Sequence, residues 1–312
     1  MFDLNCNGMM IEQHNDKLKE ILDLLVKKDV CQTDSGFSAD KDAIKKIFEV
    51  TVGDGAQIKK SDILIRLTLI DSMYSTQMGR RYYALEELAD VLDIVSVNNG
   101  GLKQLFMDFA KDPEKNISKF DYQLGKKTSN LWAECYGIGK DGSEKGIAIS
   151  LISKYAYFET GYKFPIYDSI ACEMYPMVWK KSGFDGKSPK ILEYINNGKT
   201  DGKQTIVNFI KAINLLIEKI NHPKLNYDLL DRYLWYVGKI RRGNLSLILT
   251  RDQYENTIKV FTLETITKKD GKTYENYYFN IDNVNLGNLS YLKDNDLLRM
   301  FFEMAKYYGY KK

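Results

Sequence analysis

The sequence has few of the residues on which many catalytic and metal sites depend. Only two histidines are present, His14 and His222, which leaves almost no material for a Ser-His-Asp or Cys-His triad. The four cysteines lie far apart, form no CxxC pair and have no histidine close by. This spacing indicates neither a zinc site nor an iron–sulfur cluster. We therefore expect no metal and no cofactor, and any catalysis must use Lys, Asp, Glu or Tyr.

Long apolar stretches and a strong excess of charge are also missing. No apolar run is long enough to cross a bilayer, and the first residues, MFDLNCNGMM, show no basic segment followed by an apolar one. We expect a cytoplasmic monomer with reduced cysteines and no membrane contact. The net charge of +3 does not by itself identify a nucleic-acid partner. Short basic clusters beside glycines, such as Arg80-Arg81, could contact phosphates, although each cluster alone is typical of a solvated loop.

What the sequence does contain is a large apolar fraction with helical spacing. Hydrophobic residues make up 44% of the chain and aromatic residues 12%, enough to bury one large core or two modest ones. Apolar residues recur at helical spacing over much of the chain. They predict helices over 15–28, 40–50, 61–75, 84–95, 100–120, 144–160, from 168 or 169 onward, 204–220 and 226–240.

The pattern changes after Gly243. Segments rich in β-branched and aromatic residues, separated by turn signals, predict strands within 244–250, 256–267 and 275–282. A last helix is expected over 294–310. The fold class is therefore mainly α with a small β-rich C-terminal appendage. We divide the chain into an N-terminal helical segment, 1–60, a central helical domain, 61–242, and the appendage with its closing helix, 243–312.

Three segments of the central domain carry residues suited to chemistry. The first is YSTQMGRR, residues 74–81, at the end of an apolar helix. The second is GIGK, residues 137–140, followed by a helix that carries Lys154. The third is FPIYDS, residues 164–169, in which proline stiffens the approach and Asp168 stands where a helix N-cap is expected.

Taken together, these segments resemble the helix-hairpin-helix DNA glycosylases. YSTQMGRR looks like their SxQ segment, GIGK like their hairpin, and PIYDS like their catalytic V-D segment. The run SLISKYAYFETGYKFPIYDS is similar to a pattern in bacterial proteins related to the 8-oxoguanine glycosylase (OGG) fold, and LDRYLWYVGK resembles the closing helix of that group. The resemblance covers roughly residues 60–242. It implies a helix-hairpin-helix glycosylase-like core that acts on double-stranded DNA containing a modified or damaged base, in base-excision repair or in defence against modified phage DNA.

The resemblance also implies roles for individual residues. An enzyme that cuts an N-glycosidic bond in duplex DNA must first take the nucleotide out of the stack. Gln77 would then fill the gap, with Tyr74 as a wedge beside it. The remaining DNA contacts would come from Arg80, Arg81, Gly137, Gly139 and Lys140. The glycines allow backbone N–H groups to approach a phosphate.

The chemistry at the sugar would fall to a carboxylate and an amine. As the base leaves, positive charge develops on the sugar, and Asp168 would stabilise it. A lysine amine could attack the sugar and form a Schiff base, which permits strand cleavage at the abasic site as well. Lys154 is the preferred lysine, fourteen residues before Asp168. Lys145, twenty-three residues before it, is held in reserve.

Other interpretations of the same residues remain open. Asp168 could be a plain N-cap, Lys154 a lysine that lays its stem along a core helix, and Gln77 a cap for the end of its helix. At the level of function, the alternatives are a non-catalytic DNA-binding protein that keeps the glycosylase fold and a small-molecule hydrolase that uses carboxylates. The identity of the excised base does not follow from the pattern, because packing sets the shape of the pocket.

Overall fold

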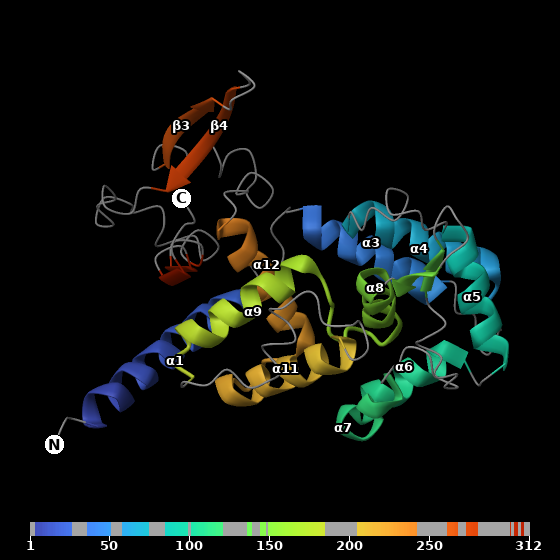
Figure 1. The fold of residues 1–312 in the computed structure, drawn as a ribbon, viewed down its shortest axis with the longest axis horizontal. Helices are drawn as coiled ribbons and strands as arrows, with labels where there is room; N and C mark the ends of the chain where they lie inside the picture. Colours follow the sequence, from blue (N-terminus) through green and yellow to red (C-terminus); the bar gives the residue numbers. More distant parts are fainter. Residues whose placement is uncertain are drawn as a thin grey trace.

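The computed structural model describes the helical core of the chain and two short β-hairpins. The described residues are 4–26, 36–50, 58–74, 85–98, 101–120, 136–138, 144–147, 149–184, 205–241, 261–267, 273–279, 300, 303, 304, 307 and 308. Within these ranges the protein is mainly α-helical (Figure 1). No helix in them is both long enough and apolar enough to span a membrane.

The helices follow one another with short connections. They are α1 (Leu4–Val26), α3 (Gly36–Val50), α4 (Lys60–Tyr74), α5 (Leu85–Asn98), α6 (Gly101–Lys111), α7 (Pro113–Asn116), the 3-10 helix η2 (Ile117–Phe120), α8 (Ile149–Glu159), α9 (Ser169–Lys181), α11 (Thr205–Ile220) and α12 (Tyr227–Arg241). The strands are β1 (Tyr136–Ile138), β2 (Glu144–Ile147), β3 (Phe261–Thr267) and β4 (Thr273–Phe279), and they pair as antiparallel β1–β2 and β3–β4.

The helices form two groups that meet at α8 and α9 (Figure 1). In the first group, α3 packs on α4, α4 on α5 and α5 on α6, and α8 contacts α3, α4 and α6. In the second group, α9 packs on α12, and α1 contacts both α11 and α12. The N-terminal helix therefore lies with the last long helices of the chain. The β3–β4 hairpin stands apart from both groups in the view of Figure 1.

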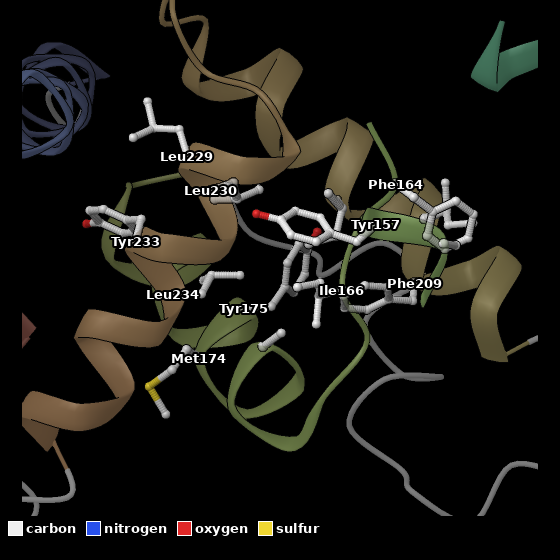
Figure 2. Close-up of a cluster of buried hydrophobic side chains, with 14 of the residues drawn as sticks. Tyr157, Phe164, Ile166, Met174, Tyr175, Phe209, Leu229, Leu230, Tyr233 and Leu234 are labelled. Atoms are coloured by element: carbon white, nitrogen blue, oxygen red, sulfur yellow. The ribbon is translucent and has the colours of Figure 1, made fainter. Parts of the chain in front are cut away.

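Buried apolar side chains of both groups form one connected core. Figure 2 shows its centre, where Tyr157 of α8 and Ile166 of the following loop lie between Phe209 of α11 and Leu230 and Leu234 of α12. Because α8 is apolar on nearly all sides, every residue from Leu151 to Phe158 is buried. A helix of this kind leaves no face for unpaired polar groups, so the polar side chains that it carries have to find partners inside the protein.

The end of α8 and the approach to α9 are fixed by backbone geometry. Gly161 has φ +60° and Tyr162 has φ 73°, which stops the helix. The N–H of Tyr162 donates to the carbonyl of Tyr157 at 2.7 Å. The chain then runs through Phe164, Pro165 and Ile166, all buried, and delivers Asp168 to the start of α9.

Most of the predicted helices are confirmed, and two are wrong in part. The helix expected over 144–160 begins at Ile149, because 144–147 forms strand β2. GIGK is therefore not a turn between two helices: Gly137 lies in β1, which pairs with β2. The intervening KDGSEK lengthens the connection enough for two strands to pair. The helix expected over 100–120 breaks into α6, α7 and η2 at Pro113, as proline requires.

The expectations for the C-terminal part concern few described residues. Strands β3 and β4 lie within the segments predicted as strands and pair across the predicted turn. The expected strand at 244–250 lies outside the described residues. In the last helix, residues 300, 303, 304, 307 and 308 are described, and all are helical. Tyr308 of this helix is buried, and its hydroxyl is hydrogen-bonded to that of Tyr233 in α12.

Candidate functional site

Lys154 is a buried lysine at the junction of the two helix groups. Only 2% of the residue is exposed, although it lies on a helix that is otherwise apolar. Its Nζ donates to Oγ of Ser150, one helical turn earlier, at 2.9 Å. The same Nζ lies 3.8 Å from Oδ2 of Asp168 and 5.6 Å from the ring centre of Tyr74. The ammonium is thus surrounded by a hydroxyl, a carboxylate and an aromatic face.

Asp168 uses its two carboxylate oxygens differently. It is the N-cap of α9, with extended backbone, and its Oδ1 accepts from the N–H of Ala171 at 2.7 Å. Its Oδ2 is the atom that faces Lys154. The side chain is 23% exposed. The cap therefore fixes the orientation of the carboxylate, and the second oxygen serves the lysine at a point that solvent can reach.

Ser153 ties the two residues together. Its Oγ accepts from the N–H of Tyr167 at 3.0 Å and donates to the carbonyl of Ser150 at 3.0 Å. Since Tyr167 immediately precedes Asp168, this hydrogen bond fixes the loop to α8. The short distance between Lys154 and Asp168 follows from this bond and from the helix cap, so it does not depend on the ion pair alone.

Helix α12 adds a second carboxylate, Asp228, to the junction. Tyr157, one turn beyond Lys154 on α8, donates to Oδ1 of Asp228 at 2.5 Å. Arg232 donates to Oδ2 at 3.1 Å, and Lys41 of α3 forms an ion pair with the same carboxylate. Burial acts to raise the pKa of Asp228, but the charges of Lys41 and Arg232 and the hydrogen bonds outweigh it and lower the pKa below its usual value. Asp228 is therefore ionised at neutral pH.

Lys41 is a second buried lysine near the site. Burial lowers the pKa of Lys41, and Asp228 opposes this effect only in part because Arg232 adds a repulsive charge. The two partners differ since Asp228 faces two cations, whereas Lys41 faces one close carboxylate. Its Nζ also lies 4.1 Å from the ring centre of Tyr162. That contact helps hold a non-glycine residue at positive φ, which costs about 1 kcal/mol.

Asp231 completes the charged cluster. It lies one turn beyond Asp228 on α12 and is partly exposed. Burial raises the pKa of Asp231 to about 8, and the negative charge of Asp168 acts in the same direction, while Lys154 and Lys41 oppose it. Carboxyl groups with pKa values driven apart are typical of sites that hold a proton for a reaction. We therefore include Asp231 in the site.

The sequence-predicted residues divide into three sets. Lys154 and Asp168 are brought together, with Tyr74 beside them, where its ring packs edge-on against Phe158 at 5.9 Å. Lys145 and Gly137 lie in strands, β2 and β1, so Lys145 does not begin the helix that carries Lys154. The remaining predicted residues lie outside the described part of the chain; they are Gln77, Arg80, Arg81, Gly139 and Lys140.

The sequence analysis missed Lys41, Asp228 and Asp231. One signal for Asp231 was available, because it stands three residues before Leu234 and seven before Gly238, on the stripe of α12 that becomes buried. No comparable signal marks Lys41, which lies 187 positions from its partner Asp228. Among the described residues, no group of three His, Cys, Asp or Glu side chains is placed to hold a metal ion.

Comparisons with protein-family models, with curated proteins and with solved structures found no match for the chain.

Proposed function

We propose that the protein is a DNA glycosylase that removes a modified base from double-stranded DNA, with Lys154 and Asp168 at its reaction centre. One observation carries the proposal: a buried lysine amine lies 3.8 Å from a carboxylate that is partly open to solvent and fixed by a helix cap. A protein that only binds DNA has no need for such a pair. The resemblance of residues 60–242 to helix-hairpin-helix glycosylases of the OGG fold supports the choice of substrate.

Asp168 is suited to stabilising positive charge on the sugar. When the bond from C1′ to the base nitrogen breaks, the base takes the electron pair, and positive charge develops on the sugar. A carboxylate that is already oriented stabilises this charge without reorganisation. Asp168 meets this requirement because Oδ1 is held by the N–H of Ala171 and Oδ2 points into the site.

Lys154 is suited to attack the same carbon. Its amine, once it has lost a proton, forms a bond to C1′ as the base departs with a proton of its own. The second amine proton leaves when the sugar ring opens, and the product is a Schiff base. The hydroxyl of Ser150 orients the Nζ atom. The face of the Tyr74 ring stabilises the ammonium until it gives up its proton.

The proposal is tested with two substitutions and a panel of duplexes. The panel contains an oxidised purine, an alkylated base, a bulky modified pyrimidine and a preformed abasic site. Asp168→Asn keeps an N-cap oxygen, so we expect base release to fall by about a hundred-fold or more while DNA affinity stays within about two-fold. Lys154→Gln should abolish the covalent adduct that borohydride traps on the susceptible duplex.

Matched controls separate chemistry from folding. Asp112 is also an N-cap, accepting from the N–H of Lys115 at 3.1 Å, and Asp112→Asn should leave base release unchanged. Lys163 is an exposed lysine near α8, and Lys163→Gln should leave the adduct intact. Equal loss of binding and base release in Asp168→Asn would make Asp168 a structural cap. A full yield of adduct in Lys154→Gln would remove Lys154 from the chemistry.

A further inference from the structure

Asp231 occupies a fixed position between the two helices that supply Lys154 and Asp168. Seven residues later on the same face of α12, Gly238 contacts α9 so closely that a Cβ there would lie 2.5 Å from Cγ2 of Ile170. One turn earlier, Asp228 is bonded to Tyr157 of α8. Contacts on both sides of Asp231 therefore fix this stretch of α12 against α8 and the start of α9.

We infer that Asp231 is a positioning residue that stays neutral while the site works and so leaves Asp168 as the ionised carboxylate beside the Lys154 ammonium. This inference rests on the proposed glycosylase function. It assigns to one carboxyl the negative charge that stabilises the sugar and to the other the task of withholding charge from the amine. A pair of nearby carboxyl groups divides these roles because close like charges disfavour double ionisation.

The surroundings of Asp231 favour the neutral form. Charged or titratable groups reach it from five helices: Asp168 from α9, Lys154 and Tyr157 from α8, Lys41 from α3, Tyr74 from α4 and Asp228 from α12 itself. Two of the carboxylates repel a charge on Asp231, and the two lysines attract it. Lys41 is already engaged by Asp228, so its attraction is shared. Burial decides the balance, and the pKa of Asp231 rises to about 8.

The neutral state matters for the amine. If Asp231 ionised, the Lys154 ammonium would face two carboxylates and would hold its proton more tightly. Less neutral amine would then be available to attack C1′. Protonation of Asp231 keeps the amine accessible to reaction near neutral pH, and its loss restrains the enzyme in alkali.

The charge state of Asp231 can be measured without DNA. Protein labelled with ¹³C at aspartate Cγ is titrated by NMR over the range of about pH 5 to pH 10, well above the ordinary aspartate range. We expect one wild-type resonance to titrate near pH 8, to be missing in Asp231→Asn and to stay in Asp112→Asn. In Asp168→Asn its midpoint should fall, because a negative neighbour is gone. A midpoint in the ordinary range, or one that Asp168→Asn does not move, would overturn the inference.

The link to activity has its own readout. We expect the ratio of the single-turnover rate of base release at about pH 9 to that at about pH 7 to be at least about three-fold larger in Asp231→Asn than in wild type. Equal ratios would overturn the positioning role, even with an alkaline midpoint. Base release with an ordinary Asp231 titration sinks the inference alone. An alkaline midpoint without base release from any duplex sinks the glycosylase proposal and the catalytic half of the inference with it. If Asp231→Asn does not fold, the wild-type and Asp168→Asn titrations still decide the charge state.

Discussion

Arg66 and Glu159 form a salt bridge of 2.7 Å between side chains that are 0% and 3% exposed. Arg66 also donates to the carbonyl of Phe48 and to the hydroxyl of Tyr155, each at 3.1 Å, and its guanidinium stacks on the Phe48 ring at 4.3 Å. One side chain of α4 thus contacts both α3 and α8. The position of α8, and with it that of Lys154, depends on this buried arginine.

We predict that Arg66→Met destabilises the protein by about 3 kcal/mol or more, because Glu159 is left with a buried and uncompensated charge. The double variant Arg66→Met with Glu159→Leu should recover a large part of the loss. Urea unfolding of both variants measures the effect. Glu49→Gln is the control, since it breaks the exposed pair with Lys45, which is worth less than about 1 kcal/mol. A double variant as unstable as Arg66→Met would show that packing of the stem matters more than charge.

Tyr157→Phe should destabilise the protein by about 1.5–3 kcal/mol, the range for a hydrogen bond to a charged group. The matched control is Tyr227→Phe, which removes a bond of 2.6 Å to the neutral amide of Asn214 and should cost about 1 kcal/mol. The contribution of Asp228 has a definite pH dependence. Because its folded pKa is lowered, its stabilising effect is present above the ordinary aspartate pKa and is lost as the pH falls through the folded value.

The difference between wild type and Tyr157→Phe should therefore narrow on acidification. Denaturant unfolding at about pH 7 and about pH 3 brackets the transition. A difference that stays constant over this range would mean that the hydroxyl does not stabilise the ionised form of Asp228.

Asp168→Ala should be less stable than Asp168→Asn by about 1 kcal/mol. Both variants remove the charge beside Lys154, so the difference between them isolates the helix cap on Ala171. Thermal unfolding of the two proteins checks the value. If they unfold at the same temperature, the cap contributes nothing, and the role of Asp168 rests on its charge alone.

How far the sequence predicted the site depended on the separation of the residues. Lys154 and Asp168 belong to one short stretch, and their relation follows from a helix, a stop at Gly161 and a cap, all of which have local signals. Lys41 and Asp228 come together only because α3 and α12 meet, and no local rule places two such helices side by side. On sequence, charged residues of this kind are indistinguishable from a solvated helix face.

The errors in the fold have equally local causes. The helix expected over 144–160 was extended too far because Ile147 and Ile149 continue an apolar pattern that strand and helix share over a short distance. Gly137 was expected in a turn, yet it lies in a strand whose partner begins at Glu144. Pairing between neighbouring segments decided both cases, and propensity alone does not reveal it.

Gly238→Ala should destabilise the protein, since the added methyl would meet Cγ2 of Ile170 at 2.5 Å. Overpacking costs about 1–3 kcal/mol, and the better helix propensity of alanine offsets about 1 kcal/mol of that. Pairing it with Ile170→Leu removes the β-branch and should restore part of the loss. A stability equal to or above that of wild type for Gly238→Ala alone would mean that α9 and α12 adjust freely.

Asp231→Asn should be more stable than wild type at neutral pH, and the gain should depend on pH. A carboxyl whose pKa rises from 3.8 in the unfolded chain to about 8 on folding loses stability as the pH rises between these values. The variant lacks this loss, so its advantage should be absent at about pH 3 and reach at least about 1 kcal/mol above pH 8. Urea unfolding across this range measures the gain. An advantage that is independent of pH would point to packing.

The contact between α1 and α12 joins parts of the chain separated by about 200 residues. During synthesis, α1 leaves the ribosome long before its partner exists, and its apolar face stays exposed to water until α12 follows. The charged cluster at the junction needs α12 as well. Folding intermediates of this protein should therefore be competent to form the α3–α6 group while still inert as an enzyme and prone to association through the waiting first helix.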